Sequence, residues 1–298
     1  MKVNVLMSTY NGEHYIKQQL DSIMSQEKVD VDLLVRDDGS WDSTLGILQK
    51  YKEKGKLRWY KGENQGPARS FLTLLQDSSD DADFYAFADQ DDFWKPEKLD
   101  VAVEKLKASK NVPALYFSRT QMTDATLKPT GIIEIEPLLT FGESLVYEFI
   151  PGCTMVFNRK LRDIVNRYSP AYLPMHDVWI YSVALAVGAK IYFDKSPHIL
   201  YRQHGSNTIG QGYSIWHEWK RRIYRFTHSE HSRYHRAYEI RKGYFDFMSK
   251  ENIGLLDDFI NCKYNFLNRI MLCFDKRYDC SRKSTRRLFN IALLLNSY

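Results

Sequence analysis

The front part of the chain alternates between short apolar runs and longer amphipathic segments. The apolar runs contain few polar positions, which is typical of strands buried on both faces of a sheet. They lie at 3–9, 31–36, 57–60, 84–88 and 114–117. Between them, apolar residues recur at helical spacing over 15–25, 43–51, 68–75 and 97–108. This repeated strand–helix order predicts an α/β fold with a mainly parallel sheet.

Beyond about residue 125 the alternation is less regular. The remaining predicted elements are a strand at 151–159, a helix at 177–188, a strand at 189–194 and a segment at 200–207 that closes the sheet region. From about residue 213 the pattern becomes helical and basic. We therefore expect one α/β domain over 1–212 and a helical C-terminal region over 213–298.

Polar clusters follow four of the predicted strands. They are STYNG at 8–12, RDDGSWDST at 36–44, GENQGPARS at 62–70 and DQDD at 89–92. Parallel sheets bind ligands beyond the carboxyl ends of their strands. Because these four clusters would meet at one edge of the sheet, the sequence predicts a binding site there.

Asp89, Asp91 and Asp92 lie within four positions directly after a buried strand. Carboxylates this close repel one another and are costly to leave unpaired. Mg²⁺ and Mn²⁺ take such oxygen ligands together with substrate phosphates. The alternative is a helix cap, since Pro96 begins a helical pattern. That alternative accounts for Asp92 but not for Asp89 and Asp91 together, so we expect a bound divalent cation.

Asp37 and Asp38 precede Gly39 at the end of the second strand. A carboxylate here can accept a hydrogen bond from a base imide or a ribose hydroxyl, and a capped turn is the alternative. Arg69 begins a helix, where backbone N–H groups also favour a diphosphate. A solvated arginine is the alternative for that position.

Several other side chains have two readings on the residues alone. Asp177 follows His176 at a helix start, where an aspartate is an ordinary cap. His204 is alone in its stretch, and a single histidine is more often structural than ligating. Trp94 and Trp179 lie beside acidic motifs, where they can stack on an acceptor sugar or simply pack in the core.

Composition and charge exclude several classes of protein. The 298 residues are 44% hydrophobic, and the four cysteines have no metal-finger spacing, so we expect free thiols. No signal-like or membrane-spanning run is visible, which predicts a cytoplasmic protein. Residues 211–298 carry 17 Lys and Arg against 9 Asp and Glu, whereas residues 1–210 carry 25 against 28. The acidic front part argues against nucleic-acid binding.

Two enzyme classes with similar elements lack their motifs here. A dinucleotide-binding dehydrogenase needs G-x-G-x-x-G after the first strand, and STYNG stands there instead. A phosphatase with D-x-D-x-T would need threonine where Phe93 stands. A non-catalytic sugar-binding module would not need Asp177 as well as the acidic cluster.

Seven motifs together carry a family resemblance. They are STYNG, RDDGSWDST, ENQGPARSF, DQDDFWKPEKL, GCTMVFNR, HDVW and YRQHGSN, in this order. As a set they resemble the family 2 inverting glycosyltransferases, whose GT-A fold has a Rossmann-like, mainly parallel sheet flanked by helices. The DQDD-x-W, HD-x-W and YRQH wording is similar to that of bacterial polysaccharide rhamnosyltransferases. The resemblance covers about residues 1–210 and does not extend to the basic tail.

The resemblance implies roles for the matching residues. Asp89, Asp91 and His204 would hold Mn²⁺ or Mg²⁺ on the donor diphosphate, and Asp177 would be the catalytic base. The expected nucleotide-sugar contacts are Thr9, Tyr10, Asn11, Asp37, Asp38, Arg69, Asp89 and Gln90. The expected acceptor contacts are Trp94, His176 and Trp179. His176 stands where many relatives have glutamate, and the missing Q-x-x-R-W motif argues against a processive, membrane-embedded synthase.

The implied activity is metal-dependent transfer of L-rhamnose from dTDP-rhamnose to a saccharide or lipid-linked acceptor in cell-surface polysaccharide synthesis. A UDP-hexose or UDP-N-acetylhexosamine donor stays open, as does a non-catalytic nucleotide-sugar-binding protein. In the tail, Trp216, Trp219, Arg221, Arg222, Tyr224 and Arg225 combine aromatic and cationic side chains. Residues 213–245 are therefore predicted either to contact the inner face of the cell membrane or to pack on the domain or a homodimer partner.

Overall fold

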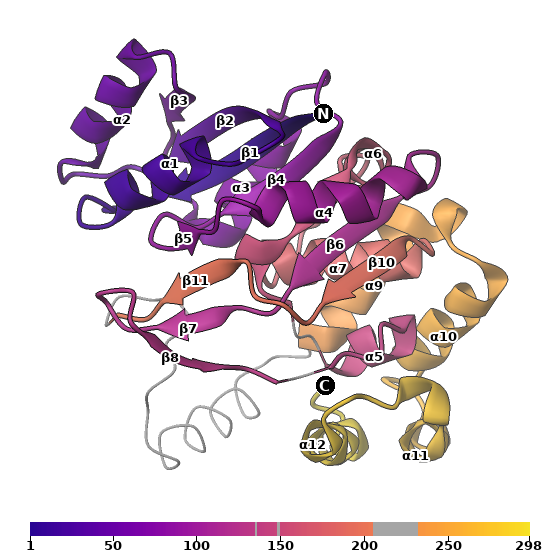
Figure 1. Ribbon diagram of the computed structural model, residues 1–298. Coiled ribbons are helices and arrows are strands. Elements are labelled where there is room, and N and C mark those ends of the chain that lie inside the picture. The colour runs from indigo at the N-terminus through magenta and orange to yellow at the C-terminus, as the bar shows by residue number, and fades with distance from the viewer. Residues whose placement is uncertain (135, 148–149, 205–231) are drawn as a thin grey trace.

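A seven-stranded sheet forms the centre of the protein, seen here in a computed structural model that describes residues 1–134, 136–147, 150–204 and 232–298 (Figure 1). Its strand order is β10-β6-β9-β4-β1-β2-β3. The strands are β1 (Lys2–Thr9), β2 (Asp30–Asp37), β3 (Arg58–Lys61), β4 (Phe84–Ala88), β6 (Ala114–Ser118), β9 (Val156–Asn158) and β10 (Lys190–Asp194).

All neighbouring strands in this sheet run parallel except around β9, which is antiparallel to both β4 and β6. Thr9 pairs with Asp37, and Met7 pairs with Ala88. The carboxyl ends of β1, β2 and β4 therefore meet at one edge, which brings the polar clusters that follow them together. The predicted mainly parallel α/β sheet is confirmed.

The helices between these strands cover both faces of the sheet. They are α1 (Ile16–Met24), α2 (Thr44–Glu53), α3 (Gly66–Gln76), α4 (Lys98–Leu106), α6 (Arg159–Val165) and α7 (His176–Ala186). Val5 and Met7 of β1 pack in one hydrophobic cluster with α1 and α4, whereas Leu6 packs in the other with α3 and α7. This alternation follows from the two-residue period of a strand and explains why both faces are apolar.

The segment predicted as a strand at 151–159 is mostly not a strand. Residues Gly152–Thr154 form a 3₁₀ turn, η2, and only Val156–Asn158 join the sheet. A second 3₁₀ turn, η1 (Lys107–Ser109), follows α4. The turn at η2 brings Gly152 and Cys153 against the neighbouring loops.

A smaller sheet lies beside the acidic cluster, with the order β5-β11-β7-β8. Its strands are β5 (Phe93–Trp94), β7 (Gln121–Thr123), β8 (Pro129–Ile132) and β11 (Ile199–Arg202). Ile199 pairs with Trp94 in antiparallel orientation. The segment predicted to close the sheet region thus enters this second sheet, and it carries His204 toward the acidic cluster.

The C-terminal helices pack on the α7 side of the central sheet (Figure 1). They are α9 (Ser232–Tyr244), α10 (Lys250–Asn261), α11 (Phe266–Phe274) and α12 (Lys283–Leu294), with the turns η3 (Phe245–Phe247) and η4 (Lys276–Tyr278). The short helix α5 (Phe141–Val146) lies among them. Tyr244, Leu256 and Phe259 belong to the same hydrophobic cluster as Trp179 of α7.

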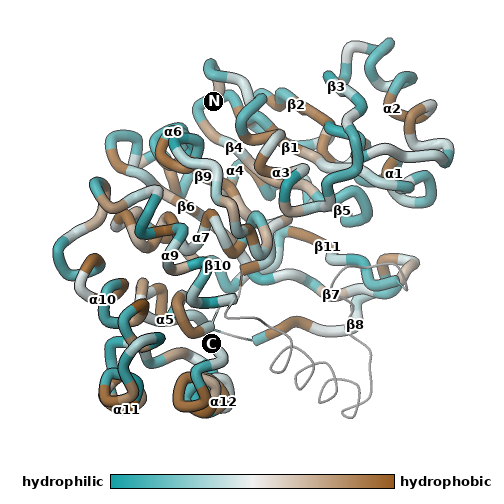
Figure 2. The backbone as a smooth tube through the Cα atoms, turned by 180° about the vertical axis from the view of Figure 1, so that it is seen from behind, coloured by the Kyte–Doolittle hydropathy of each residue, from teal (hydrophilic) through white to brown (hydrophobic). Residues whose placement is uncertain are grey.

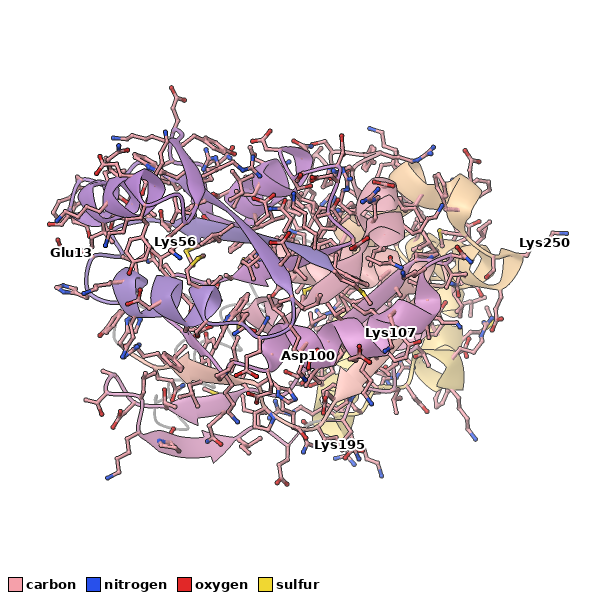
Figure 3. The ribbon with its side chains drawn as sticks, turned by 45° about the horizontal axis from the view of Figure 1, so that its top comes forward. Glu13, Lys56, Asp100, Lys107, Lys195 and Lys250 are labelled. Carbon is pink, nitrogen blue, oxygen red and sulfur yellow. The ribbon has the colours of Figure 1, made fainter. Side chains whose placement is uncertain are left out.

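The predicted domain boundary at 212/213 lies outside the described residues, as do the six tail residues singled out in the sequence, and the division into two regions stays a prediction. Among the helices described, none has the length and apolar character needed to cross a membrane. Charged side chains such as Lys195 and Lys250 are exposed and point outward from the molecule (Figure 3).

Candidate active site

The loop after β1 is tied to the acidic cluster and to the loop after β2. The Gln90 side chain accepts a hydrogen bond from Tyr10 N at 2.9 Å and donates one to Tyr10 O at 3.0 Å. A Cβ on Gly12 would lie 2.3 Å from Gln90 Oε1, so a larger residue there would displace the Gln90 side chain. Asn11 N donates to Ser40 Oγ at 2.9 Å. The predicted donor residues Tyr10, Asn11 and Gln90 thus lie together.

Asp37 organises the turn that follows β2. Its fully buried carboxylate accepts hydrogen bonds from Thr9 Oγ1 at 2.9 Å, Gly39 N at 3.0 Å and Ser40 N at 2.8 Å. Gly39 has a φ of 94°, which favours glycine. These hydrogen bonds are those of a capped turn, which was the alternative for this position. A contact between Asp37 and a nucleoside stays a prediction.

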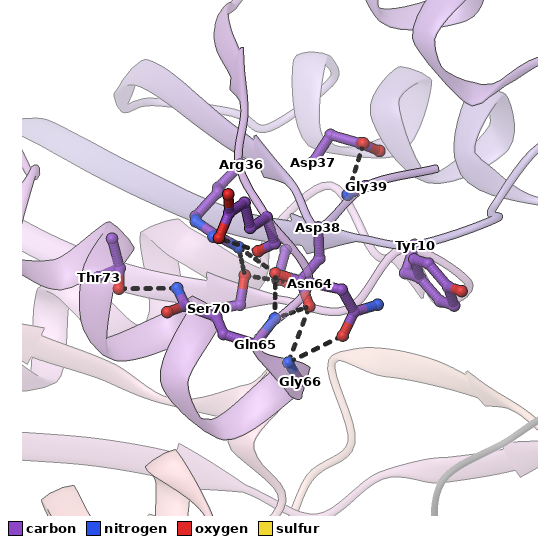
Figure 4. A network of polar contacts seen from close by, with 12 residues as sticks. Tyr10, Arg36, Asp37, Asp38, Gly39, Asn64, Gln65, Gly66, Ser70 and Thr73 are labelled. Atoms are coloured by element: carbon purple, nitrogen blue, oxygen red, sulfur yellow. Dashed lines mark hydrogen bonds and ion pairs between the residues drawn. The ribbon is translucent and has the colours of Figure 1, made fainter. Parts of the chain in front are cut away.

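Asp38 caps the N-terminus of α3 (Figure 4). Its carboxylate accepts hydrogen bonds from Gln65 N at 3.2 Å and Gly66 N at 2.9 Å, and it forms a buried ion pair with Arg36. Arg36 Nη1 also donates to Ser70 Oγ at 3.0 Å. An anion at a helix N-terminus satisfies orphan N–H groups, so Asp38 holds the third polar cluster against the second.

The start of α3 lies next to the segment that leads into α7. Arg69 is partly exposed, and its Nη2 donates to Ala171 O at 2.8 Å. Two residues along, the Phe71 ring stacks on His176 with 4.0 Å between centroids. Arg69, predicted to contact a diphosphate, is therefore close to the α7 segment that carries Asp177.

The acidic cluster and the segment after β11 are in direct contact. Asp91 Oδ2 and His204 Nε2 are 2.9 Å apart, and the His204 ring lies against Tyr15 at a centroid distance of 4.7 Å. Gln19 Nε2 donates to Asp89 O at 2.9 Å and holds that part of the loop. The structure thus brings together two residues that are 113 positions apart and that the resemblance assigns to one metal.

Arg202 is a residue of this site that the sequence analysis missed. Its Nε donates to Asp91 O at 2.8 Å, and its backbone N donates to Asp92 Oδ1 at 3.2 Å. Its guanidinium also lies 4.5 Å from the Tyr15 ring centroid and donates to Gln18 Oε1 at 2.5 Å. One buried side chain therefore connects β11 with the acidic cluster and α1. The sequence feature that could have identified Arg202 is its position in the YRQH motif.

Two further polar residues that were not predicted from the sequence, Cys153 and Lys98, are buried beside the acidic cluster. Ligand atoms of Asp89, Asp92 and Cys153 lie within 4.8 Å of one another. Lys98 Nζ lies 3.5 Å from the centroid of the Trp94 ring and has no hydrogen-bond partner among the described residues. Burial raises the pKa of the Cys153 thiol and lowers the pKa of Lys98 to about 7. Burial and the neighbouring carboxylates raise the pKa of Asp92.

Asp177 shares this site with the acidic cluster. It lies in the first turn of α7 and is 9% exposed, and a Cβ on Gly152 would come within 3.1 Å of its Oδ2. Burial, then the charge of Asp91, then that of Asp177 raise the pKa of Asp89 to about 8. Cys153, the residue after Gly152, has its Sγ within 4.8 Å of carboxylate oxygens of Asp89 and Asp92, so η2 connects Asp177 with the acidic cluster.

The predicted acceptor contacts of the two tryptophans are wrong. Trp94 and Trp179 are both 0% exposed, so neither ring offers a face to a sugar, and the core-packing alternative accounts for both. His176 is 4% exposed and lies between the rings of Phe71 and Phe87. Burial lowers the pKa of His176, which favours its neutral form. In this position His176 supports the start of α7.

The acidic cluster fits a hard divalent cation. Asp92 Oδ2 is buried and has no hydrogen-bond partner among the described residues, and burial together with the charge of Asp91 raises the pKa of both Asp89 and Asp92. A cation relieves this repulsion. The Cys153 thiol suits such a cation poorly, because thiolates prefer softer metals and burial keeps this thiol protonated.

Comparison with known proteins points to one family. A family model described as glycosyl transferase family 2 matches residues 4–164. The dTDP-rhamnosyl transferase RfbG of Shigella flexneri is 31% identical over 233 residues, which cover 72% of this chain and 77% of RfbG. The poly(ribitol-phosphate) beta-N-acetylglucosaminyltransferase TarS of Staphylococcus aureus is 29% identical over 49% of this chain and 28% of TarS.

Solved structures agree in fold. The crystal structure of residues 1–349 of S. aureus TarS has a TM-score of 0.60 and 17% identity, covering 99% of this chain and 81% of that one. The mannosyltransferase PcManGT of Pyrobaculum calidifontis has a TM-score of 0.53 and 16% identity, covering 99% of this chain and 86% of that one. The predicted GT-A fold is confirmed. The family match and the similarity to RfbG show that this chain belongs to glycosyltransferase family 2.

Proposed function

We propose that the protein is an inverting hexosyltransferase that moves L-rhamnose from dTDP-rhamnose to a hydroxyl of a saccharide or lipid-linked acceptor. The observation that carries this proposal is the turn η2, whose Gly152 packs against Asp177 and whose Cys153 thiol lies within 4.8 Å of carboxylate oxygens of Asp89 and Asp92. The acidic cluster suits a donor diphosphate and its cation, and Asp177 is a separate acid at the start of α7. An inverting transfer needs both functions in one place.

The donor would lie along the loops after β1, β2 and β4. Thr9 ends β1 and Tyr10 and Asn11 follow it, and Tyr10 is the most exposed of the three, at 45%. Its ring can stack on a nucleoside base. Arg69 at the start of α3 supplies a positive charge for the diphosphate. The bonds between these loops hold the pocket in shape before the donor arrives.

We assign the cation to Asp89, Asp91 and His204, with Mn²⁺ favoured over Mg²⁺ because imidazole is among the ligands. When bound, a divalent cation neutralises charge that develops on the departing diphosphate. The chain's own part is to orient these ligands. Arg202 fixes the backbone of Asp91, and Gln19 fixes that of Asp89.

Asp177 would accept the proton of the acceptor hydroxyl. The hydroxyl oxygen attacks the anomeric carbon while the bond from that carbon to the diphosphate oxygen breaks, and the proton passes to the Asp177 carboxylate. Positioned general bases of this kind contribute roughly 10²–10⁴ in rate. The close packing of Gly152 against Asp177 fixes where that carboxylate stands.

Replacement of Asp177 by asparagine tests the proposal. We expect transfer to fall by roughly 10²–10⁴, because an amide cannot take the proton, while nucleotide affinity measured by calorimetry stays the same. The matched control is Asp246→Asn, at an exposed position in η3 outside the site. Near wild-type transfer by the Asp177→Asn variant would show that this residue is not the base.

The choice of donor rests on relatives. RfbG is named a dTDP-rhamnosyl transferase, which supports dTDP-rhamnose. TarS has been solved with UDP-GlcNAc and with UDP, which keeps a UDP-N-acetylhexosamine as the second candidate. PcManGT has been solved with GDP-Man and Mn²⁺. Thermal-shift measurements with dTDP, UDP and GDP, each with and without Mn²⁺, separate these donors by the size of the stabilisation.

We also place the enzyme in the cytoplasm, at the inner face of the cell membrane, where nucleotide sugars meet lipid-linked acceptors. Membrane contact through 213–245 and a homodimer both stay predictions. Residues 205–231 lie outside the described part of the chain, and within 213–245 the structure describes 232–245, which form α9 and the first residue of η3.

A further inference from the structure

Two neighbouring C-terminal helices present large apolar side chains to solvent. Their side chains are between 37% and 82% exposed. We call this set the α11–α12 face, and it consists of Phe266, Leu267, Met271, Phe274, Leu288, Ile291, Leu294 and Leu295. Scattered exposed apolar residues are ordinary, but a contiguous set marks an interaction site.

The spacing of these residues shows that they form one stripe on each helix. On α11, Leu267, Met271 and Phe274 follow one another at intervals of four and three. On α12, Leu288, Ile291 and Leu294 follow one another at intervals of three. The opposite sides of the helices are buried, with Leu272 of α11 at 4% and Leu293 of α12 at 0% exposure. Each helix therefore has two apolar sides, and only one of them is used by the core.

The two helices are joined into a single platform. Arg286 Nη2 donates to Leu272 O at 2.8 Å, and Arg269 Nη1 donates to Leu294 O at 3.2 Å. Figure 2 shows brown segments on both helices at the end of the molecule that lies farthest from α2. The exposed apolar side chains are thus held on well-anchored backbone rather than on a frayed terminus.

The surroundings of this platform are strongly basic. Residues 261–298 contain eight Lys and Arg against two Asp and no Glu. The exposed cations are Lys276, Arg277, Arg282, Lys283 and Arg287. Arg277 is paired with Asp258 and Asp275, whereas Lys283 and Arg287 lie in the first turns of α12, next to the apolar stripe.

We propose that the α11–α12 face docks onto an anionic lipid bilayer, with its apolar side chains in the headgroup boundary and its cations at the phosphates. An apolar stripe flanked by Lys and Arg suits such a surface. A second copy of the chain fits less well, because a symmetric contact would bring two basic regions together. The inference does not depend on which sugar is transferred, and it concerns residues outside the predicted 213–245 contact.

Vesicle flotation of the full chain tests this proposal. We expect binding to vesicles of phosphatidylglycerol and phosphatidylcholine, little binding to phosphatidylcholine alone, and loss of binding as salt is raised. Leu267→Glu combined with Phe274→Glu should weaken binding at least about tenfold. Lys283→Gln combined with Arg287→Gln should weaken vesicle binding by roughly 30-fold, since each Lys or Arg near an anionic membrane surface contributes a similar share of the binding free energy.

The control is Val112→Glu, an aliphatic residue of 40% exposure outside both helices, which should leave binding unchanged. If the wild-type chain does not bind anionic vesicles at low salt, the proposal is overturned without any variant. Vesicle binding that survives all four substitutions places the contact elsewhere. A dimer seen by light scattering that Phe274→Glu converts to monomer, without vesicle binding, identifies a second copy as the occupant.

Discussion

Asp89 and Asp92 are both harder to ionise than an ordinary aspartate, because burial and the charge of Asp91 raise their pKa. For Asp89, burial and then the charges of Asp91 and Asp177 raise the pKa to about 8, against a usual value of 3.8. Between pH 3.8 and about pH 8 the Asp89 carboxyl is therefore protonated in the folded chain and ionised in the unfolded chain. Stability gained from that proton is lost as pH rises through the folded pKa, so the free energy of unfolding falls from pH 5 to pH 8.

This pH dependence of the free energy of unfolding gives a prediction for cation binding. We expect the melting temperature of metal-free protein to fall between pH 6 and pH 8, because the acidic cluster loses its proton and its charges repel. Mn²⁺ should raise the melting temperature more at pH 8 than at pH 6, since at the lower pH it competes with that proton. Differential scanning calorimetry at the two pH values measures both effects.

Asp89→Asn provides the comparison for this experiment. The variant has one acid fewer, so both the fall with pH and the gain from Mn²⁺ should shrink. Equal stabilisation by Mn²⁺ at the two pH values, in wild-type protein, would contradict the placement of the cation at the acidic cluster.

At the scale of single residues, the acids of the site could be predicted from the sequence but their buried support could not. Asp89, Asp91 and Asp177 stood out because they follow strands or begin helices. Lys98, Cys153 and Arg202 did not stand out, because their roles depend on contacts between segments far apart in the chain. Trp94 and Trp179 were misjudged for the same reason, since exposure of a ring depends on tertiary packing.

At the scale of elements, the turn η2 sets the position of the start of α7. A Cβ on Gly152 would lie 3.0 Å from both Asp177 Cβ and His176 Nε2. Interiors this closely packed leave a neighbour little room to give way. The position of the proposed base therefore depends on a glycine that belongs to a different element.

Gly152→Ala should displace Asp177 by a few tenths of an ångström. We expect the transfer rate to fall roughly tenfold to a hundredfold, while nucleotide affinity is retained, because reacting groups are sensitive to small displacements. Steady-state kinetics and calorimetry together measure the two effects. Gly46→Ala in α2, where an added Cβ meets nothing within 4 Å, is the control. Unchanged kinetics in Gly152→Ala would mean that η2 does not position the base.

The regular elements of the front part were predicted well because long apolar runs and helical spacing are local signals. The strand at 84–88 agrees at both ends with β4, and 114–117 differs from β6 by one residue. The short strands β5, β7 and β8 were not predicted, since two to four residues carry too little periodicity. The antiparallel orientation of β9 depends on its neighbours rather than on its own sequence.

At the scale of the whole molecule, the C-terminal helices are part of the same hydrophobic cluster as α7. Close backbone contact reinforces this, because a Cβ on Gly142 of α5 would lie 1.9 Å from Arg277 O in η4. Sequence pattern predicted the helical nature of this region and its charge. It did not predict how the region packs, because the apolar side chains of its helices are shared between core and solvent.

Gly142→Ala tests how strongly the two parts depend on each other. The added methyl must push η4 away, so we expect a loss of about 1–3 kcal/mol in the free energy of unfolding, measured by urea denaturation. Gly254→Ala in α10 is the control, since an added Cβ there meets nothing within 4 Å and alanine favours helix. If the two variants unfold alike, the contact between α5 and η4 contributes little to the fold.

The reach of Arg202 has a bearing on protein engineering. Arg202 connects β11 with the acidic cluster and α1, three segments that a recombination scheme would exchange separately. Grafting residues 89–92 from a relative without the matching 199–204 stretch would leave a guanidinium facing the wrong neighbours. The two segments should therefore be exchanged together, because libraries built from single loops would break the contacts between them.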